Sequence, residues 1–473
     1  MLRIIILCIC TALVTSVYAQ QDGEKWEMSQ ELELIKGTYF KVFGKWKGDY
    51  KMARIADNYV ELLSFRDDLT IRWGRMLSLV QKEPIVHEVI GADERIFVLY
   101  SIEQEDSLQL VLARYEHNGN ARSSMIVKNI PKELGRPAYE PILSENNEWL
   151  SLSYLGIDGL YEVVVISLKN MLKIREDVYD FASFELEGKY PYQYVTDYGT
   201  VFIGVDFFEV RDNTPNQFMT FLQVFPDDRD TEIKELSFKN YIVENPLFHF
   251  DNEDSLLYLM GILRDFRIPA GMGIYMKAIP IDFETDSEAT AIMLDKSIVD
   301  VYNKKLRNPL PGIPGLRMAD IHREDDGQFT IMTEVRFDIF TSAGTSSMRG
   351  GNDMEHYYDE VVIMRLDKNG DVIYQQLLEK EQYSINDGAV KSSFFTMKKG
   401  NDYHLIFNDQ VRNRANVKEF IIRPDGTTSE ETLFSTRRMR RDIYISSAVK
   451  ISEEEFVVPG KRRRSANLIR YRF

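Results

Sequence analysis

A short pattern recurs along most of the chain and limits what it can fold into. Each copy is a turn rich in Asp, Glu, Asn or Gly, followed by a strand-like run that opens with an aromatic or aliphatic residue. The runs begin at Tyr50, Ile96, Leu150, Val201, Leu256, Phe329, Tyr403 and Phe456. From Ile96 onward the steps are 54, 51, 55, 73, 74 and 53 residues. This period predicts a series of repeated β units, with insertions inside the two long steps.

The clearest single unit is the segment Glu360–Leu378. Two apolar, β-branched runs flank Asn369-Gly370, a pair that supplies the positive-φ residues of a tight turn. The segment is therefore predicted to be a β-hairpin. Its runs are apolar on both faces, which is expected where sheets pack face to face.

A four-stranded unit of this length resembles a blade of the β-propeller superfamily. The resemblance covers residues 20–473 and concerns architecture alone, because no Trp-Asp, kelch or Asp-box signature is present. It implies an all-β fold of four-stranded antiparallel blades. Seven hairpins can be counted, and the last strand, Asn467–Phe473, lacks an outer partner that Glu24–Leu34 can supply. We therefore predict eight blades in a ring closed by an N-terminal strand, with a seven-bladed ring or a multi-sheet sandwich as the alternatives.

The first nineteen residues have the features of a targeting segment. Arg3 precedes the apolar run Ile4–Val14, which is too short to span a bilayer, and Val17-Tyr18-Ala19 suits cleavage by signal peptidase. The sequence thus predicts a signal peptide over residues 1–19 and an exported protein, periplasmic or extracellular. Cys8 and Cys10 leave with this segment, and no Asn-x-Ser/Thr acceptor occurs. Both observations favour a bacterial protein that is stabilised by its core alone.

The charge of the chain limits its partners. A formal net charge of −16 argues against nucleic acid or an anionic membrane surface as the ligand. No second long apolar run occurs, so no membrane span is expected in the mature chain. We expect a monomer without a cofactor.

The two long steps place insertions at residues 294–315 and 342–357. With the strands of a blade lettered A to D from the inside outward, the first insertion joins D to A and the second joins B to C. Asp295 or Ser297 is expected to cap a short helix that ends near Leu306. The B–C and D–A connections of a propeller share one face, so both insertions are predicted there. Long connections on one face of a rigid scaffold are where binding usually resides.

Basic residues gather in the same kinds of connection. Residues 411–473 hold fifteen Lys or Arg against eight Asp or Glu. The predicted ligand-binding residues are Arg264, Arg267, His356, Arg412, Arg414, Arg437, Arg438, Arg440, Arg441, Lys461, Arg462, Arg463 and Arg464. Because guanidinium groups match carboxylate, sulfate and phosphate geometry, the predicted ligand is an anionic glycan or an acidic protein segment. The alternative is that these are solvated charges, or that they pair with acidic neighbours such as Glu453–Glu455.

Metal and catalytic motifs are weak. The turn Asp367-x-Asn369-Gly370-Asp371 resembles a calcium loop but lacks the distal glutamate. The six histidines are scattered without ligand spacing, and His404 is expected to be a packed strand residue. No Gly-x-Ser-x-Gly elbow is present, nor a cysteine in the mature chain. We therefore predict no metal site and name no catalytic residue.

Three functions remain open. The first is a non-catalytic, exported propeller that binds a ligand or partner on the face carrying the B–C and D–A connections. The second is an extracellular polysaccharide hydrolase or lyase with acid and base groups on that face, and the third is a scaffold in an envelope assembly. Aromatic residues in those connections, such as Phe207, Phe208 and Phe266, could stack on sugars, although aromatic side chains more often lie in the core.

Overall fold

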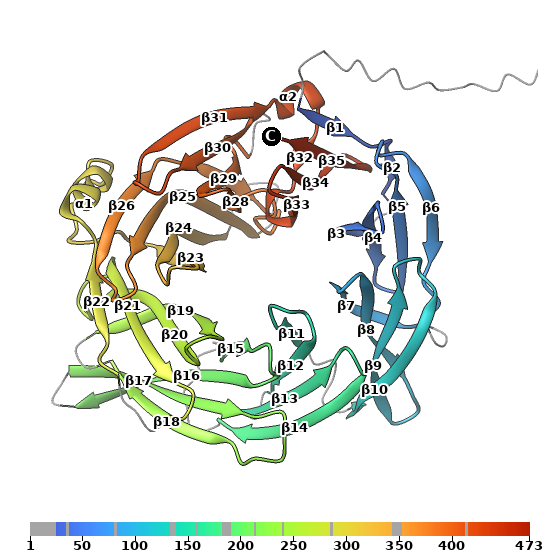
Figure 1. Cartoon of the computed structure of the whole chain (residues 1–473), viewed down its shortest axis with the longest axis horizontal. Coiled ribbons are helices and arrows are strands. Elements are labelled where there is room, and N and C mark those ends of the chain that lie inside the picture. Colours follow the sequence, from blue (N-terminus) through green and yellow to red (C-terminus); the bar gives the residue numbers. More distant parts are fainter. Residues whose placement is uncertain are drawn as a thin grey trace, which may run out of the picture.

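The computed structural model describes residues 25–34, 37–79, 83–132, 139–156, 159–181, 191–211, 214–238, 241–283, 287–342, 352–411 and 415–473. These residues form eight antiparallel sheets arranged in a ring (Figure 1). The prediction of an eight-bladed propeller is confirmed, and the alternatives of seven blades or a sandwich are wrong. The predicted signal peptide lies outside the described residues, as do Arg412 and Arg414.

Each blade is a meander that runs from the inner to the outer edge of the ring. Blade 1 contains β3 (Tyr39–Trp46), β4 (Asp49–Ala56), β5 (Tyr59–Phe65) and β6 (Ile71–Met76). Blade 2 contains β7 (Ile85–Ala92), β8 (Arg95–Glu103), β9 (Ser107–Glu116) and β10 (Ala121–Pro131). Blade 3 contains β11 (Glu140–Leu143), β12 (Trp149–Leu155), β13 (Leu160–Ser167) and β14 (Leu172–Asp180). Blade 4 contains β15 (Tyr192–Val195), β16 (Val201–Arg211), β17 (Thr214–Val224) and β18 (Glu232–Ser237).

The second half of the ring follows the same plan. Blade 5 contains β19 (Ile242–Asp251), β20 (Leu256–Arg264), β21 (Gly271–Pro280) and β22 (Thr290–Met293). Blade 6 contains β23 (Leu316–Arg323), β24 (Phe329–Ser342), β25 (Asn352–Leu366) and β26 (Val372–Leu378), with β27 (Gln382–Ile385) added to β25. Blade 7 contains β28 (Phe394–Lys399), β29 (Asp402–Asn408), β30 (Val417–Ile422) and β31 (Thr428–Phe434). Blade 8 contains β32 (Asp442–Ile443), β33 (Val449–Ser452), β34 (Glu455–Arg462) and β35 (Ser465–Arg472). Two helical turns, α2 (Thr436–Met439) and η2 (Ile445–Ser447), lie between blade 7 and β33.

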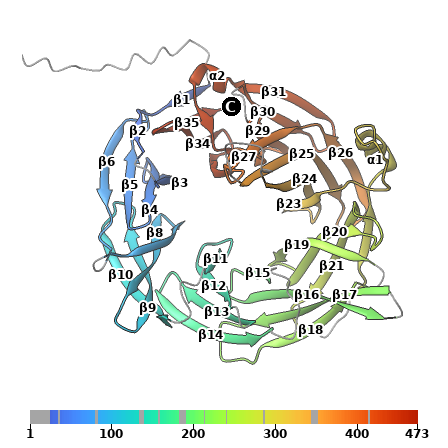
Figure 2. The same cartoon turned by 180° about the vertical axis from the view of Figure 1, so that it is seen from behind.

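The ring closes through the N-terminal segment, as the sequence predicts. β1 (Trp26–Met28) pairs antiparallel with β35, and β2 (Leu32–Glu33) pairs with the other end of the same strand. Figure 1 and Figure 2 both place β1 beside β35. β1 is therefore the outermost strand of blade 8, and the first and last parts of the chain share one sheet.

A buried polar network joins blade 8 to blade 1. Arg470 on β35 is 2% exposed, forms an ion pair with Glu27 on β1 and donates to the hydroxyl of Tyr50 on β4 at 2.9 Å. The Tyr50 hydroxyl in turn donates to Oε1 of Glu455 on β34 at 2.6 Å. Arg472 Nε donates to the other Glu455 oxygen at 2.6 Å. The closure therefore combines strand pairing with hydrogen bonds between charged groups, which are stronger than neutral ones.

The hydrophobic core lies between neighbouring blades. In β8, seven of nine residues are buried, because both faces of the strand contact another sheet. Phe97 and Leu112 of blade 2 pack against Leu150 and Val164 of blade 3, and equivalent clusters occur at other blade interfaces. The runs identified in the sequence all belong to the second strand of a blade. Their apolar character on both faces thus follows from the propeller architecture.

The insertion at 294–315 begins with α1 (Lys296–Asn303). The side chain of Asp295 accepts a hydrogen bond from the Ser297 amide at 2.7 Å, so the predicted cap is confirmed. Buried residues of α1 join the core shared by blades 5 and 6, and the helix lies at the outer side of the ring, beside β22 and β26 (Figure 1). Beyond the helix the chain returns inward, where Ile313 and Gly271 exchange two backbone hydrogen bonds of 2.9 Å. The helix itself is therefore part of the scaffold.

The insertion at 342–357 is more regular than the expected irregular connection. β25 already begins at Asn352, so residues 352–357 continue the β24–β25 hairpin, while residues 343–351 lie outside the described part. β27 pairs with this extension from Gln382, opposite Tyr358, to Ile385, opposite Glu355.

None of the helices within the described ranges is long and apolar enough to cross a membrane.

Candidate functional site

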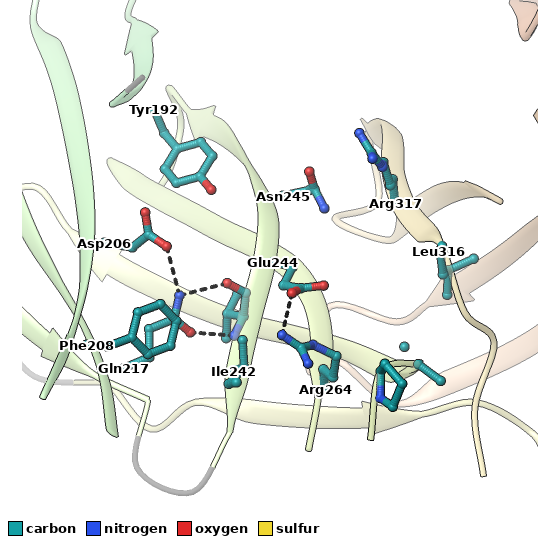
Figure 3. Close-up of a pocket in the computed structure, with 15 residues that line it drawn as sticks. Tyr192, Asp206, Phe208, Gln217, Ile242, Glu244, Asn245, Arg264, Leu316 and Arg317 are labelled. Carbon is teal, nitrogen blue, oxygen red and sulfur yellow. Dashed lines mark hydrogen bonds and ion pairs between the residues drawn. The ribbon is translucent and has the colours of Figure 1, made fainter. Parts of the chain in front are cut away.

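Among the residues that the structure describes, three sizeable clefts open on the face that carries the B–C and D–A connections. The largest, about 750 Å³, is lined by residues of blades 4, 5 and 6, and we call it the blade 4–6 cleft (Figure 3). A second cleft of about 510 Å³ lies between blades 6 and 7. A third, of about 430 Å³, is lined by Arg462, Arg463, Arg464, Ser465, Glu31 and Glu33.

The predicted ligand-binding residues do not share one cleft. Arg264 lines the blade 4–6 cleft, whereas Arg462–Arg464 line the third cleft on blade 8. Four other predicted arginines are exposed and line none of the three clefts: Arg267, Arg437, Arg438 and Arg440. The ammonium group of Lys461 lies 5.9 Å from the centre of the Tyr444 ring. The basic residues of this face thus form separate groups.

Two of the predicted residues that lie outside the three clefts have structural partners. Arg441 is 3% exposed, donates from Nε to Asn467 Oδ1 at 2.6 Å and forms an ion pair with Glu31. His356 lies on the β25 extension, where its Nδ1 is 2.6 Å from Oδ1 of Asp338 on β24. Neither side chain lines the three clefts. Both stabilise the connections that carry them.

A bulge in β19 shapes the blade 4–6 cleft. Pairing with β20 shifts between Glu244 and Leu247, and Asn245 adopts a left-handed conformation with φ of +50°. Opposite the bulge lies Gly261, where an added Cβ would be 2.4 Å from Val243 Cγ1 and 3.2 Å from the Glu244 carbonyl oxygen. The glycine therefore allows the bulge to approach β20 closely, and the bulge brings Asn245 to the cleft wall.

Gln217 fixes the neighbouring wall of the cleft. Its side chain is 1% exposed and forms two hydrogen bonds with the backbone of Val243: Oε1 accepts from the amide at 2.6 Å, and Nε2 donates to the carbonyl at 3.0 Å. Nε2 also donates to Oδ2 of Asp206 at 3.2 Å. Gln217 on blade 4 thereby joins blade 5 and orients the Asp206 carboxylate. Hydrogen bonds that hold the wall residues in place from behind make the wall rigid.

The charged groups of the cleft differ in how they are paired. Arg264 Nη2 contacts Glu244 Oε1 at 2.6 Å, so these two charges neutralise each other. Arg317, half-buried at the start of β23, has no carboxylate partner among the described residues, and the amide of Asn245 has no hydrogen-bond partner there either. Figure 3 shows Tyr192 and Asp206 on one side of the cleft, Arg317 on the other and Asn245 between them. The cleft thus presents an unpaired guanidinium group beside an amide.

Tyr192 adds a hydroxyl group to the blade 4 side. Burial raises the pKa of this hydroxyl, and the nearby carboxylates of Asp206 and Glu244 raise it further. The group is therefore protonated at neutral pH and can donate a hydrogen bond. With Asp206 as an acceptor beside it, this side of the cleft suits a ligand that carries hydroxyl groups.

The third cleft is lined by a turn that contains three consecutive arginines, Arg462–Arg464. Arg463 adopts φ of +51° at the tip of the β34–β35 turn, and the Ser465 hydroxyl donates to the Arg462 carbonyl at 3.1 Å. Within the described ranges none of the three guanidinium groups forms an ion pair with a carboxylate. Their role in binding an anion stays a prediction, and Glu31 and Glu33 line the same cleft.

The cations of the second cleft are already paired. Lys418 contacts Asp409 at 3.1 Å and Glu430 at 2.8 Å. Lys380 is 4% exposed and contacts Glu334 Oε1 at 2.6 Å, and burial lowers its pKa. Lys305 forms an ion pair with Glu360. These contacts lie within blade 7, within blade 6 and between blade 6 and the insertion that precedes it, and each lysine that lines this cleft in the described part of the chain has a carboxylate partner.

The turn at Asp367 is explained by its own hydrogen bonds. Asp367 Oδ1 accepts from the amides of Asn369 at 2.8 Å and Asp371 at 2.9 Å. Within the residues that the structure describes, no group of three or more His, Cys, Asp or Glu side chains is placed to hold a metal ion. His404 is 5% exposed and contacts Glu419 at 2.7 Å, so its prediction as a packed residue is confirmed.

Most residues of the blade 4–6 cleft were not predicted from the sequence. Four of them are ordinary polar residues in strands that no local motif distinguishes: Tyr192, Asp206, Gln217 and Arg317. Asn245 carries the one available signal, because Asn-Pro inside an apolar run marks a break in the strand. That break is the bulge on which the cleft is built.

Comparisons with known proteins identify no family for this chain. No protein-family model matches the chain, and no curated protein matches it. The Nup133 β-propeller domain of Vanderwaltozyma polyspora shares 8% identity over 94% of this chain and 100% of that chain, with a TM-score of 0.43. The polysaccharide lyase Uly1 shares 10% identity over 94% and 99%, with a TM-score of 0.41, and BamB from Moraxella catarrhalis shares 8% over 95% and 100%, with a TM-score of 0.40. At these values the similarity concerns the fold alone.

Proposed function

We propose that this protein is an exported, non-catalytic β-propeller that binds an anionic ligand on the face carrying the B–C and D–A connections, with the blade 4–6 cleft as the principal site. The observation that carries the proposal is Arg317, a half-buried guanidinium group on the cleft wall without a carboxylate partner in the described part of the chain. An unpaired, partly desolvated arginine favours a carboxylate, sulfate or phosphate group. The Asn245 amide beside it adds donors to the same anion.

The carboxylates of the cleft support binding rather than catalysis. Glu244 is held by Arg264, and Asp206 accepts from Gln217. A glycosidase needs one carboxyl group that gives a proton to the leaving group and a second that acts as base or nucleophile. Both carboxylates of this cleft instead serve as acceptors in contacts that support the walls. The glycosidase alternative therefore has no carboxyl group among the lining residues that is free of such contacts.

The arginine turn, Arg462–Arg464, would be a second point of contact for a long ligand. Arg462–Arg464 belong to the same face as the blade 4–6 cleft but lie on blade 8. A polymeric anion that occupies the cleft can extend over this face toward the turn. Changing these three residues to Ser is expected to lower the salt concentration at which the protein leaves a heparin or polygalacturonate column, because surface contacts to anions are screened by salt. Unchanged, salt-insensitive retention would contradict a role for the turn.

The test of the principal site uses thermal unfolding. Trigalacturonate, a heparin tetrasaccharide and tri-glutamate are each added to the mature protein, with maltotriose as the neutral control. A ligand at one hundred times its Kd stabilises the folded state by about 2.7 kcal/mol. We expect at least one anionic probe to raise Tm in the wild type, with an affinity about 10- to 100-fold weaker in Arg317→Gln because a charge-assisted hydrogen bond is lost.

Arg122→Gln is the matched control for this substitution. Arg122 is an exposed arginine on β10, the outer strand of blade 2, where it lies 3.9 Å from Glu116. Its replacement should leave binding unchanged. The proposal fails if no anionic probe shifts Tm, or if Arg317→Gln binds as well as Arg122→Gln does.

Two further measurements separate the alternatives. Export is supported by Arg3, the apolar run Ile4–Val14 and the Val17–Ala19 site, and Edman sequencing of protein recovered from the periplasm or medium should begin at Gln20. Incubation with the polymeric form of the bound probe should leave its chain length unchanged. Shortened products would favour the polysaccharide hydrolase or lyase, whereas the absence of any soluble ligand would favour the envelope scaffold.

A further inference from the structure

Exposed aromatic rings accompany the polar groups of the blade 4–6 cleft. Phe208, on β16, lines the cleft and is 47% exposed. Phe266 is also exposed, at 51%, but it is not among the residues that line the cleft, unlike Pro269 and Ala270 of the same connection between β20 and β21. The Tyr192 ring also faces this space (Figure 3). Large apolar side chains left exposed around a polar cleft are typical of a binding surface.

The polar groups are arranged along the cleft by type. Donors to an anion, Arg317 and Asn245, come from blades 6 and 5, whereas Asp206 and the Tyr192 hydroxyl lie on the blade 4 side (Figure 3). Phe208 belongs to that same side, two residues from Asp206. A ligand that matches all three features carries a negative group at one position, and at another position it carries hydroxyl groups together with a flat, apolar C–H surface.

We propose that the ligand of the blade 4–6 cleft is an acidic oligosaccharide, a chain of uronic-acid units, whose carboxylate contacts Arg317 and one of whose sugar rings stacks on Phe208. This inference rests on the proposed function and narrows it to one class of ligand. Sugar hydroxyl groups can both donate to Asp206 and accept from Tyr192, and the C–H face of a pyranose ring covers an aromatic ring. An acidic peptide has carboxylates for Arg317 but carries no rigid ring with hydroxyl groups on its edge.

The test compares two trivalent anions by isothermal titration calorimetry on the full mature protein. Trigalacturonate is expected to bind at least tenfold more tightly than tri-glutamate. Phe208→Ala should weaken the binding of trigalacturonate by about fivefold to tenfold, which is the loss expected for one stacked ring. This change should not alter the binding of tri-glutamate.

Phe340→Ala is the matched control, because Phe340 is 59% exposed on the β24 hairpin and does not line the cleft. Phe208→Trp retains a flat ring and should retain the affinity, so it tests stacking even if the alanine variant does not fold. One result would overturn this inference and leave the proposed function intact. In that result tri-glutamate binds at least as tightly as trigalacturonate, and its affinity falls in Arg317→Gln but not in Phe208→Ala. Failure of both probes to bind would overturn this inference, and the proposed function fails as well if no other anionic probe binds.

Discussion

The hydroxyl of Tyr50 offers a direct test of how the ring is held closed. Tyr50 is fully buried, donates to Glu455 at 2.6 Å and accepts from Arg470 at 2.9 Å. In Tyr50→Phe the ring keeps its packing while both hydrogen bonds disappear. Each of these bonds involves a charged group, and such bonds contribute about 1.5–3 kcal/mol.

The expected loss lies near the lower end of that range. Glu455 keeps its contact with Arg472, and Arg470 keeps its ion pair with Glu27, so neither charge is left without a partner. We therefore expect Tyr50→Phe to lower the free energy of unfolding by about 2 kcal/mol. For roughly 450 residues the entropy of unfolding is about 1 kcal/mol/K, so the corresponding fall in Tm is about 2 °C.

The matched control is another tyrosine of blade 1. The hydroxyl of Tyr59 is buried and has no hydrogen-bond partner within the described ranges, so Tyr59→Phe should cost nothing or slightly stabilise the fold. Calorimetry and urea unfolding of both variants give the comparison, and a double-mutant cycle with Glu455→Gln should return a coupling energy of about 1–2 kcal/mol. Equal midpoints for Tyr50→Phe and Tyr59→Phe would refute the assignment of the network to ring closure.

Other parts of the fold give three further predictions. Burial raises the pKa of Asp359 to about 6, and the charge of Glu360 contributes to the rise. The protonated carboxyl group is therefore favoured in the folded state. Its contribution to the free energy of unfolding is lost as the pH rises from about 4 to 6. Asp359→Asn should therefore be more stable than the wild type by about 1 kcal/mol at pH 7, after allowance for the partial exposure of the group, and no more stable at pH 3.5; thermal unfolding at both values checks this. Asp295→Ala should cost about 1 kcal/mol and speed hydrogen exchange in α1 but not in β8, because the helix loses its cap. Gly261→Ala should cost about 1–3 kcal/mol and weaken ligand binding, because its Cβ would push against Val243 beside the bulge; unchanged affinity in a destabilised variant would show that the bulge does not shape the cleft.

The scaffold could be predicted because its signals are local and repeated. A polar turn followed by an apolar run marks the second strand of each blade, and eight such marks fix the number of blades. The unpaired strand at the C-terminus predicted the N-terminal partner that the structure shows in β1. The cap of α1 was also predictable, because Asp295 precedes a short helical pattern. The packing of α1 at the outer side of the ring depends on its tertiary contacts and could not be read from the length of the insertion.

The candidate site was predictable only where its residues are adjacent in the chain. Arg462–Arg464 form a run, and the structure leaves them together in one turn. The blade 4–6 cleft instead combines residues from Tyr192 to Arg317, which come from three blades. Their meeting depends on strand register, on the bulge at Asn245 and on the glycine opposite it. Of these, only the bulge has a local signal in the sequence, the Asn245-Pro246 pair inside an apolar run.

The acidic net charge is compatible with an anionic ligand because the acidic turns lie on the opposite face. Asp68, Asp367 and Asp425 lie in C–D turns, where each carboxylate accepts from backbone amides, and hydrogen bonding lowers the pKa of all three. Strands of about seven residues separate the two faces by roughly 23 Å. The Debye length at physiological ionic strength is about 8 Å, so these charges are largely screened before they reach the ligand face. For the ligand that we propose, the local charges of Arg317 and of the arginine turn therefore matter more than the total of −16.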